Sequence, residues 1–474
     1  MPCHLESPPR RSVLYDIPPV PVGAQDRRVD LLDALDVLHE HLTQSLCDQV
    51  YESNRTTERN REWTLATLSQ FWTAIVLRAP ESLTQALQEA AHGRDELLPH
   101  VETTEEAFFQ KCKGLHWKFF HGLYYRYTQS VLPEAEPLYA QSAAGLIGRF
   151  PNLFLIDGSR LDSVAHRLKI AQKTRKVLLP GCLTACYDLF RGITRQVLYD
   201  PDAAKAELNR ARQIVPAFPK GSLWVGDRLY ASIQFFWDLE NAGQFGVFRF
   251  NRTVGVTRKH LIGRGRTIDG GRWEEWLVEA GSGQTAPKIT LRLIVWKKKG
   301  EATRKLLTNI LDPEHLTAEE ALALYPLRWQ VERLFNDLKT VLNLNRFYAA
   351  NPNAVAMQVY ATAIVHTAFR IAQGRIAKRH EISPDWISTA KLFPKLAVAS
   401  IYWSGAELGF HATCRANPGV QLAKPNWHRE RFAQTTLGAI CVERRNEHRR
   451  ARRFCKSRRR WTSFTRLPGG RKLT

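Results

Sequence analysis

Four residues whose side chains can bind phosphate or a metal ion recur at helical spacing in residues 324–344, "LYPLRWQVERLFNDLKTVLNL", here called the signature segment. They are Tyr325, Arg328, Glu332 and Lys339. At about 100° per residue all four project into a wedge about 60° wide, and the apolar side chains of the segment project elsewhere. A carboxylate beside an arginine, a lysine and a tyrosine suits a metal-assisted reaction on a nucleic-acid backbone. For a helix considered by itself, a face of solvated charges is the alternative interpretation.

A single carboxylate cannot hold two divalent ions, so this chemistry requires further acids at the ends of buried strands. Asp157 ends the apolar run of "NLFLIDGS" (strand expected over 152–157), and Asp227 ends that of "GSLWVGD". Because the ends of neighbouring strands meet at one edge of a sheet, we expect these two carboxylates to be close in space. The other acids nearby, Asp162, Asp188 and Asp238, are predicted to be surface or structural groups.

The three acidic segments, with the full Tyr-x2-Arg-x3-Glu-x6-Lys spacing, resemble the DDE transposases of bacterial insertion sequences, specifically the IS-four type. The resemblance covers about residues 150–375. It implies that Asp157, Asp227 and Glu332 are the catalytic, metal-binding residues of DNA end cleavage and strand transfer. Two Mg2+ ions are expected there, with Mn2+ as a substitute.

The same resemblance implies which other residues contact DNA. They are Tyr325, Arg328 and Lys339 of the signature segment, and Arg228 and Tyr230 after Asp227. Leu229 stands where the family commonly has glycine, which leaves the local turn geometry open. The implied partners are double-stranded DNA, as transposon ends and target, and a second copy of the chain in a homodimeric synaptic complex. Cleavage through a hairpin end is one route that the family suggests.

The net charge of +22 predicts polyanion binding, and its distribution is uneven. Residues 251–310 carry +8 and residues 442–474 carry +11, which together account for +19 of the total. Nucleic acid is therefore the expected partner. An acidic membrane surface or simple solubility is the alternative explanation.

The order of the predicted elements indicates an α/β fold with an RNase H-like catalytic core interrupted by a β-rich insertion, an all-helical N-terminal domain and a helical C-terminal region. The expected division is a disordered N-terminus (1–24), a helical DNA-binding domain (25–150), the first part of the core (151–250), a basic β-rich insertion (251–310), the second part of the core (311–376), a helical C-terminal region (377–441) and a basic tail (442–474). In the insertion, Trp273, Trp276 and Trp296 fit either sheet packing or stacking on an extruded base.

Eight scattered cysteines do not form a disulfide framework, so a reducing compartment is expected. Cys182 and Cys186 are predicted to face one packed layer, and a zinc site at Cys441, His448 and Cys455 lacks a close pair. No signal peptide or transmembrane segment is predicted, which indicates a cytoplasmic, nucleoid-associated protein.

Two other functions share parts of the pattern of acids and basic segments: an RNase H-like nuclease without strand transfer, and a catalytically inactive DNA-binding regulator.

Overall fold

The computed structural model describes residues 27–31, 36–93, 97–139, 145–161, 181–202, 206–281, 288–399 and 434–441. Several predictions lie outside these residues: the disordered N-terminus (1–24), the position of Asp162, residues 400–433 of the helical C-terminal region, and the basic tail (442–474) with His448 and Cys455 of the possible zinc site. No helix among the described residues is long and apolar enough to span a membrane.

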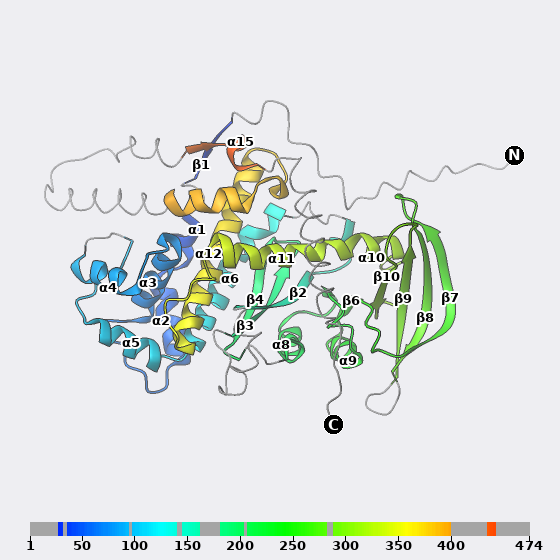
Figure 1. Cartoon of the computed structure of the whole chain (residues 1–474), viewed down its shortest axis with the longest axis horizontal. Coiled ribbons are helices and arrows are strands. Elements are labelled where there is room, and N and C mark those ends of the chain that lie inside the picture. The colour runs from blue at the N-terminus through cyan, green and yellow to red at the C-terminus, as the bar shows by residue number, and fades with distance from the viewer. Residues whose placement is uncertain are drawn as a thin grey trace, which may run out of the picture.

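A nine-stranded mixed sheet runs from the centre of the molecule to one end, in the order β4-β3-β2-β5-β6-β10-β9-β8-β7 (Figure 1). Its strands are β2 (Leu153–Arg160), β3 (Cys182–Asp188), β4 (Ile193–Asp200), β5 (Leu223–Gly226), β6 (Phe245–Arg249), β7 (Val256–Arg266), β8 (Arg272–Ala280), β9 (Ile289–Lys297) and β10 (Arg304–Thr308). The strand pairs β2–β5 and β5–β6 are parallel, and all other neighbours are antiparallel. The fold is therefore mixed α/β.

Helices cover both faces of the sheet at β2 and β5, which explains why these strands are apolar on both sides. Leu153 and Leu155 of β2 join a core shared with α12 (Pro352–Arg379). Phe154 and Ile156, one residue out of phase, join a second core with α8 (Glu207–Ile214) and α9 (Ile233–Asn241). Figure 1 shows α8 and α9 on one side of the sheet and α11 on the other. The strand that carries Asp157 is thus held from two directions.

The N-terminal region is helical, as its periodicity predicts. Its helices are α1 (Asp36–His41), α2 (Gln44–Asn54), α3 (Leu65–Arg78), α4 (Leu83–His92), α5 (Glu105–Gly114) and α6 (Lys118–Tyr139). Side-chain oxygens of Thr43, Thr64, Ser82 and Thr104 cap α2 to α5. Helix α12 packs against α3 and α6, so these helices adjoin the sheet instead of forming a detached unit. Two short strands, β1 (Arg28–Asp30) and β11 (Gln434–Thr436), pair antiparallel with each other, and α15 (Leu437–Ile440) follows.

The signature segment is helical as far as Val341 but is not the single regular α-helix that we predicted. Helix α10 (Ala318–Leu324) passes into a 3-10 turn (Tyr325–Arg328), then into α11 (Trp329–Asn336) and a π-helical turn (Asp337–Val341). Pro326 lacks an N–H group and cannot continue the α-helical hydrogen bonding, which accounts for the first change. The predicted apolar stripe is nevertheless correct, because Val331, Leu334 and Leu338 are all buried.

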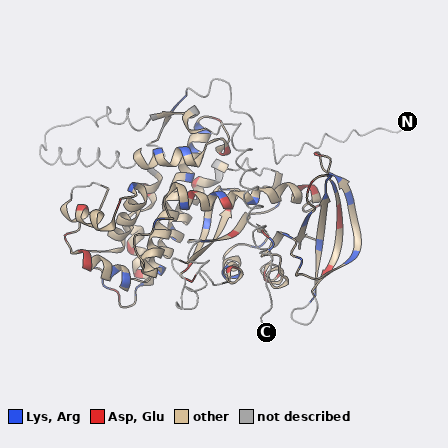
Figure 2. Cartoon of the chain, in the orientation of Figure 1, with Lys and Arg blue, Asp and Glu red and all other residues tan. Residues whose placement is uncertain are grey.

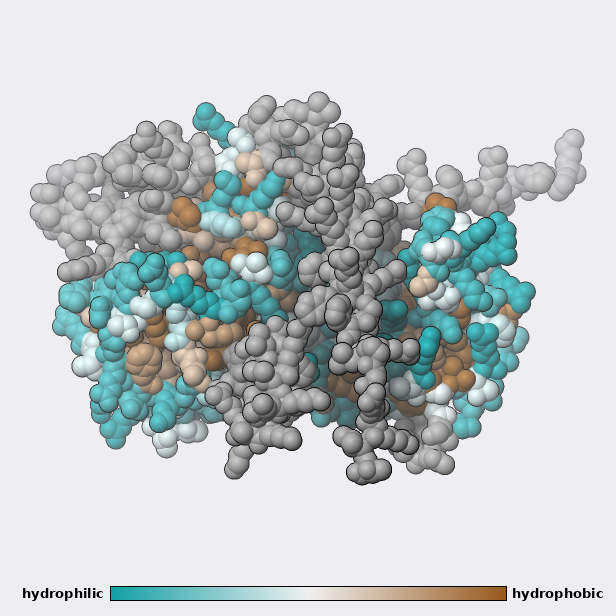
Figure 3. Space-filling view, viewed as in Figure 1, coloured by the Kyte–Doolittle hydropathy of each residue, from teal (hydrophilic) through white to brown (hydrophobic). Residues whose placement is uncertain are grey.

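The basic strands after β6 continue the central sheet. Strand β10 pairs with β6 on one side and with β9 on the other. Figure 2 shows Lys and Arg distributed along β7 to β10, and Figure 3 shows that this end of the molecule is largely hydrophilic. The insertion is therefore tied to β6 by backbone hydrogen bonds.

Candidate active site

Asp157 lies within β2 and not at its end, because the strand continues to Arg160. Its Oδ1 accepts a hydrogen bond from the Gly158 amide at 2.9 Å, and its Oδ2 lies 2.9 Å from Nη1 of Arg328. Burial raises the pKa of the Asp157 carboxyl to about 7. Arg328 opposes this shift, whereas the charges of Glu207 and Asp227 add to it. The site thus concentrates negative charge around a carboxyl that has lost much of its water.

Arg328 connects the strand to the signature segment. Its second terminal nitrogen, Nη2, lies 2.6 Å from Oε1 of Glu332, and only 13% of its side chain is exposed. One guanidinium therefore contacts both Asp157 and Glu332, residues that are 175 positions apart in the sequence. The predicted face of the signature segment does point toward Asp157.

Asp227 follows β5 directly, as expected from the strand pattern. Its Oδ1 accepts a hydrogen bond from the Leu229 amide at 2.6 Å. Leu229 is not among the described non-glycine residues with positive φ, so this turn does not need the glycine that is common in the family. Asp227 is close enough to Asp157 to raise its pKa.

Lys339 projects from the π-helical turn toward the end of β2. Its Nζ donates to Oγ of Ser159 at 2.6 Å and to the carbonyl oxygen of Arg160. Burial lowers the pKa of Lys339 and raises that of the half-buried Tyr325. Arg228 is exposed. The structure thus brings Arg328, Glu332 and Lys339 to β2 and leaves Arg228 at the surface.

Tyr230 requires a correction. We predicted a DNA contact, but the side chain is fully buried in the core beneath the site. Its hydroxyl donates a hydrogen bond to Glu207 at the start of α8. A buried tyrosine cannot touch DNA directly, so its contribution is to position other groups. Glu207 itself was missed, since nothing in its local sequence distinguishes it from other helical glutamates.

The other acids have the structural roles that we predicted where they are described. Asp188 is fully buried and forms ion pairs with Arg191 at 2.9 Å and Arg195 at 3.1 Å. Asp238 pairs with Arg212 on the surface of the α8–α9 layer. Neither carboxylate has unused charge for a metal ion. Cys182 and Cys186 are both buried in β3, in agreement with packing.

Comparison with known proteins gives consistent results. A family model described as a transposase DDE domain matches residues 149–368. A protein of Sinorhizobium fredii named as a transposase is 31% identical over 263 residues, which cover 51% of this chain and 72% of the relative. The chain belongs to the IS-four-type DDE transposases of bacterial insertion sequences.

Two further similarities are more distant. A protein of Geobacillus stearothermophilus, named as the transposase of an insertion sequence element, is 23% identical over 169 residues, which cover 36% of this chain and 44% of the relative. A solved piggyBac transposase synaptic complex with hairpin DNA aligns with a TM-score of 0.36 at 10% identity, covering 83% of each chain. The family assignment makes this chain a DNA-cleaving and strand-transferring enzyme.

The active site of this transposase offers oxygen ligands. Its carboxylates suit a hard cation such as Mg2+. Within the described part of the chain, the one group of three possible ligands within 4.8 Å of one another is Glu40, His41 and Glu134, on the N-terminal helices. Arg375 already pairs with both glutamates of that group. Asp157, Asp227 and Glu332 do not meet this 4.8 Å criterion in the described part of the chain.

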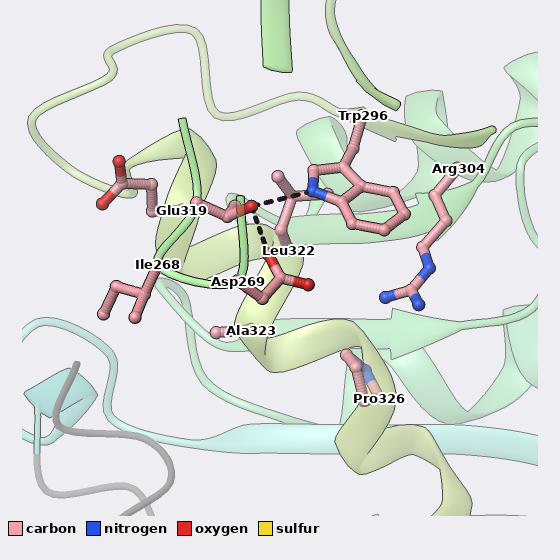
Figure 4. Close-up of a pocket in the computed structure, with 9 residues that line it drawn as sticks. Ile268, Asp269, Trp296, Arg304, Glu319, Leu322, Ala323 and Pro326 are labelled. Carbon is pink, nitrogen blue, oxygen red and sulfur yellow. Dashed lines mark hydrogen bonds between the residues drawn. The ribbon is translucent and has the colours of Figure 1, made fainter. Parts of the chain in front are cut away.

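A pocket of about 280 Å³ separates the transposase insertion from α10 (Figure 4). Trp296 and Arg304 line it, and the guanidinium carbon of Arg304 lies 4.4 Å from the ring centroid of Trp296. The ring nitrogen of Trp296 donates to Thr267 at 3.0 Å. Trp296 is only 2% exposed, while Trp273 and Trp276 are half-buried. All three tryptophans therefore take part in packing the insertion.

Proposed function

We propose that Asp157, Asp227 and Glu332 form the divalent-metal centre with which this transposase cuts the ends of its element and joins them to target DNA. The observation that carries the proposal is the shared guanidinium. Arg328 contacts Asp157 and Glu332 at 2.9 and 2.6 Å, which holds the carboxylates of a strand and a helix on the same side of the sheet, next to Asp227. Two Mg2+ ions bound there would stabilise charge on the attacking and leaving oxygens.

The cationic residues have separate tasks in this proposal. Arg328 neutralises two carboxylates in the free protein and lies where a phosphate oxygen of the cut strand would approach. Lys339, fixed by Ser159 at 2.6 Å, adds a second positive charge at the end of β2. Arg228 is exposed and can contact the DNA backbone. Tyr325 would donate a hydrogen bond to the cut DNA strand.

We further propose that the core is RNase H-like. Support comes from the strand order β4-β3-β2-β5-β6, in which an antiparallel hairpin precedes parallel strands linked through α8 and α9. The N-terminal helices would recognise the transposon end, and the basic insertion would contact its backbone, with two copies of the chain in the synaptic complex. A bacterial cytoplasm, with the protein on the nucleoid, is the compartment that fits this substrate.

The test is a cleavage and joining assay with DNA that carries the terminal inverted repeats of the element. Asp157→Asn, Asp227→Asn and Glu332→Gln should each abolish cleavage in Mg2+ while end binding is retained, because each removes one charge at nearly constant volume. Asp238→Asn, a carboxylate outside the site, is the control and should remain active. Normal turnover by any one of the first three variants would remove that residue from the site.

The products separate the remaining functions. Joined products identify strand transfer, whereas cut ends without joining would indicate a nuclease. Specific end binding without cleavage by the parent protein would favour a regulator. Of the three outcomes, the family assignment favours joining.

A further inference from the structure

A second carboxylate approaches β2 from the layer opposite to the signature segment. Glu207 is the first residue of α8, which packs on the α9 side of the sheet. A Cβ atom placed on Gly158 would lie 2.2 Å from Cδ and 2.3 Å from Oε2 of Glu207. Position 158 therefore has no room for a side chain, because the carboxyl group of Glu207 occupies that space.

The Glu207 carboxyl meets the same backbone group as Asp157. The Gly158 amide donates to Oδ1 of Asp157 at 2.9 Å. The same amide lies near Glu207 and lowers the pKa of its carboxyl. Two carboxyl groups from different elements thus lie next to Gly158, the residue that directly follows a predicted metal ligand.

Tyr230 connects Glu207 to the segment that carries Asp227. It follows Asp227 by three residues, and its hydroxyl donates to Oε1 of Glu207. Its ring is fully buried, with centroids 5.7 Å from Phe235 and 6.1 Å from Phe248. A hydroxyl on a ring packed this tightly can hold Glu207 in one orientation. The position of the carboxyl is therefore fixed and does not depend on a mobile side chain.

Positive charge balances Glu207 only in part in the free protein, because the charge of nearby Arg210 lowers the pKa of this carboxyl. Among the residues that the structure describes, no lysine, arginine or histidine forms an ion pair with it. Arg328 contacts Asp157 and Glu332 and is thereby occupied. Burial and the charge of Asp227 raise the pKa of Glu207. Carboxylates brought together in this way repel one another, and a divalent cation between them would remove that repulsion.

We propose that Glu207 is a fourth carboxylate of the metal-binding centre, reaching it from the α8 side and held there by Tyr230. The inference rests on the proposed function, since it takes Asp157 and Asp227 to bind divalent cations. Glu207 then shares the ion nearest Asp157 and Asp227, while Glu332 approaches from the opposite layer.

The test measures direct binding of Mn2+ to the full-length protein without DNA. The electron paramagnetic resonance signal of the free ion serves as the readout of the titration. Glu207→Gln keeps the shape of the side chain and an oxygen for the Tyr230 hydroxyl. It should weaken Mn2+ binding by about tenfold or more. Tyr230→Phe should weaken binding in the same direction but by less, because the carboxylate remains and only its orientation is lost. Glu240→Gln, which changes an exposed carboxylate on α9, is the matched control and should bind like the parent.

The outcomes distinguish this inference from the proposed function. If Asp157→Asn abolishes Mn2+ binding but Glu207→Gln binds like the parent, Glu207 is only a structural partner of Tyr230 and the inference is wrong. If Asp157→Asn also binds like the parent, the metal centre itself has been misplaced. Thermal melts accompany each titration, since a purely structural role would lower the melting temperature of Glu207→Gln and leave the Mn2+ affinity unchanged.

Discussion

Replacing Asp157 with asparagine should stabilise the metal-free protein at high pH. In the folded chain the pKa of this carboxyl is raised from 3.8 to about 7, chiefly by burial. Between these two values the folded state keeps the proton and the unfolded state has lost it. The free energy of unfolding therefore falls as the pH rises through this window, and it levels off above the folded pKa.

The size of the effect follows from the same two values. The raised pKa corresponds to a penalty of about 4 kcal/mol at pH 8, where the carboxyl is ionised in both states, and of only about 2 kcal/mol at pH 5. Asparagine resembles the protonated carboxyl and does not titrate. The difference in the free energy of unfolding between Asp157→Asn and the parent should therefore be larger at pH 8 than at pH 5, by about 2 to 3 kcal/mol in favour of the variant.

Thermal melts in the presence of a chelator measure this effect. The melting temperature of the variant minus that of the parent should be a few degrees larger at pH 8 than at pH 5. Glu106→Gln, an exposed carboxylate in the first turn of α5, controls for the loss of one negative charge and should show no such pH dependence. A difference that stays constant between the two pH values would mean that Asp157 ionises normally in the fold. The account of the site as a crowded, desolvated cluster would then be refuted.

Other predictions use the same protein. Parent Mn2+ affinity, measured without DNA, should rise as the pH increases through about 7, because bound metal displaces the proton of Asp157; a flat profile would contradict this. Arg328→Ala should lose most cleavage activity while remaining folded by circular dichroism, and an unfolded variant would show that packing depends on this side chain. Leu334→Ala should destabilise the domain by about 2 to 5 kcal/mol in denaturant titrations, since the side chain is only 2% exposed; stability equal to the parent would mean that the site can collapse around the gap. Deleting residues 443–474 should weaken DNA binding and flatten its dependence on salt, and an unchanged slope would show that the tail contacts no phosphates.

The sequence was most informative where local pattern determines structure. Apolar runs ending near Asp157 and Asp227 identified the two strands beside these acids, and helical spacing put Glu332 on the face that meets Asp157 through Arg328. Alternation also predicted the strands of the insertion. In each case the pattern lies within a few residues of the group that it positions.

Features that depend on distant contacts could not be predicted in this way. Glu207 is 49 residues from Gly158 and 23 from Tyr230, and neither spacing follows from a helix or strand period. For the same reason, the sequence around Tyr230 did not indicate that this side chain would be buried. The continuation of β2 beyond Asp157 depends on its pairing with β3, where Arg160 faces Cys182, and not on its own composition.

The pairing of β6 with β10 has a consequence for how this enzyme could change in length. The chain leaves β6 at Arg249 and returns beside it at Leu306 of β10, and these two residues are partners in the same ladder. An excursion that begins and ends at adjacent points can grow or shrink with little change in chain entropy and without moving β5. Complete excision would expose the free edge of β10, which would then be open to pairing with another chain.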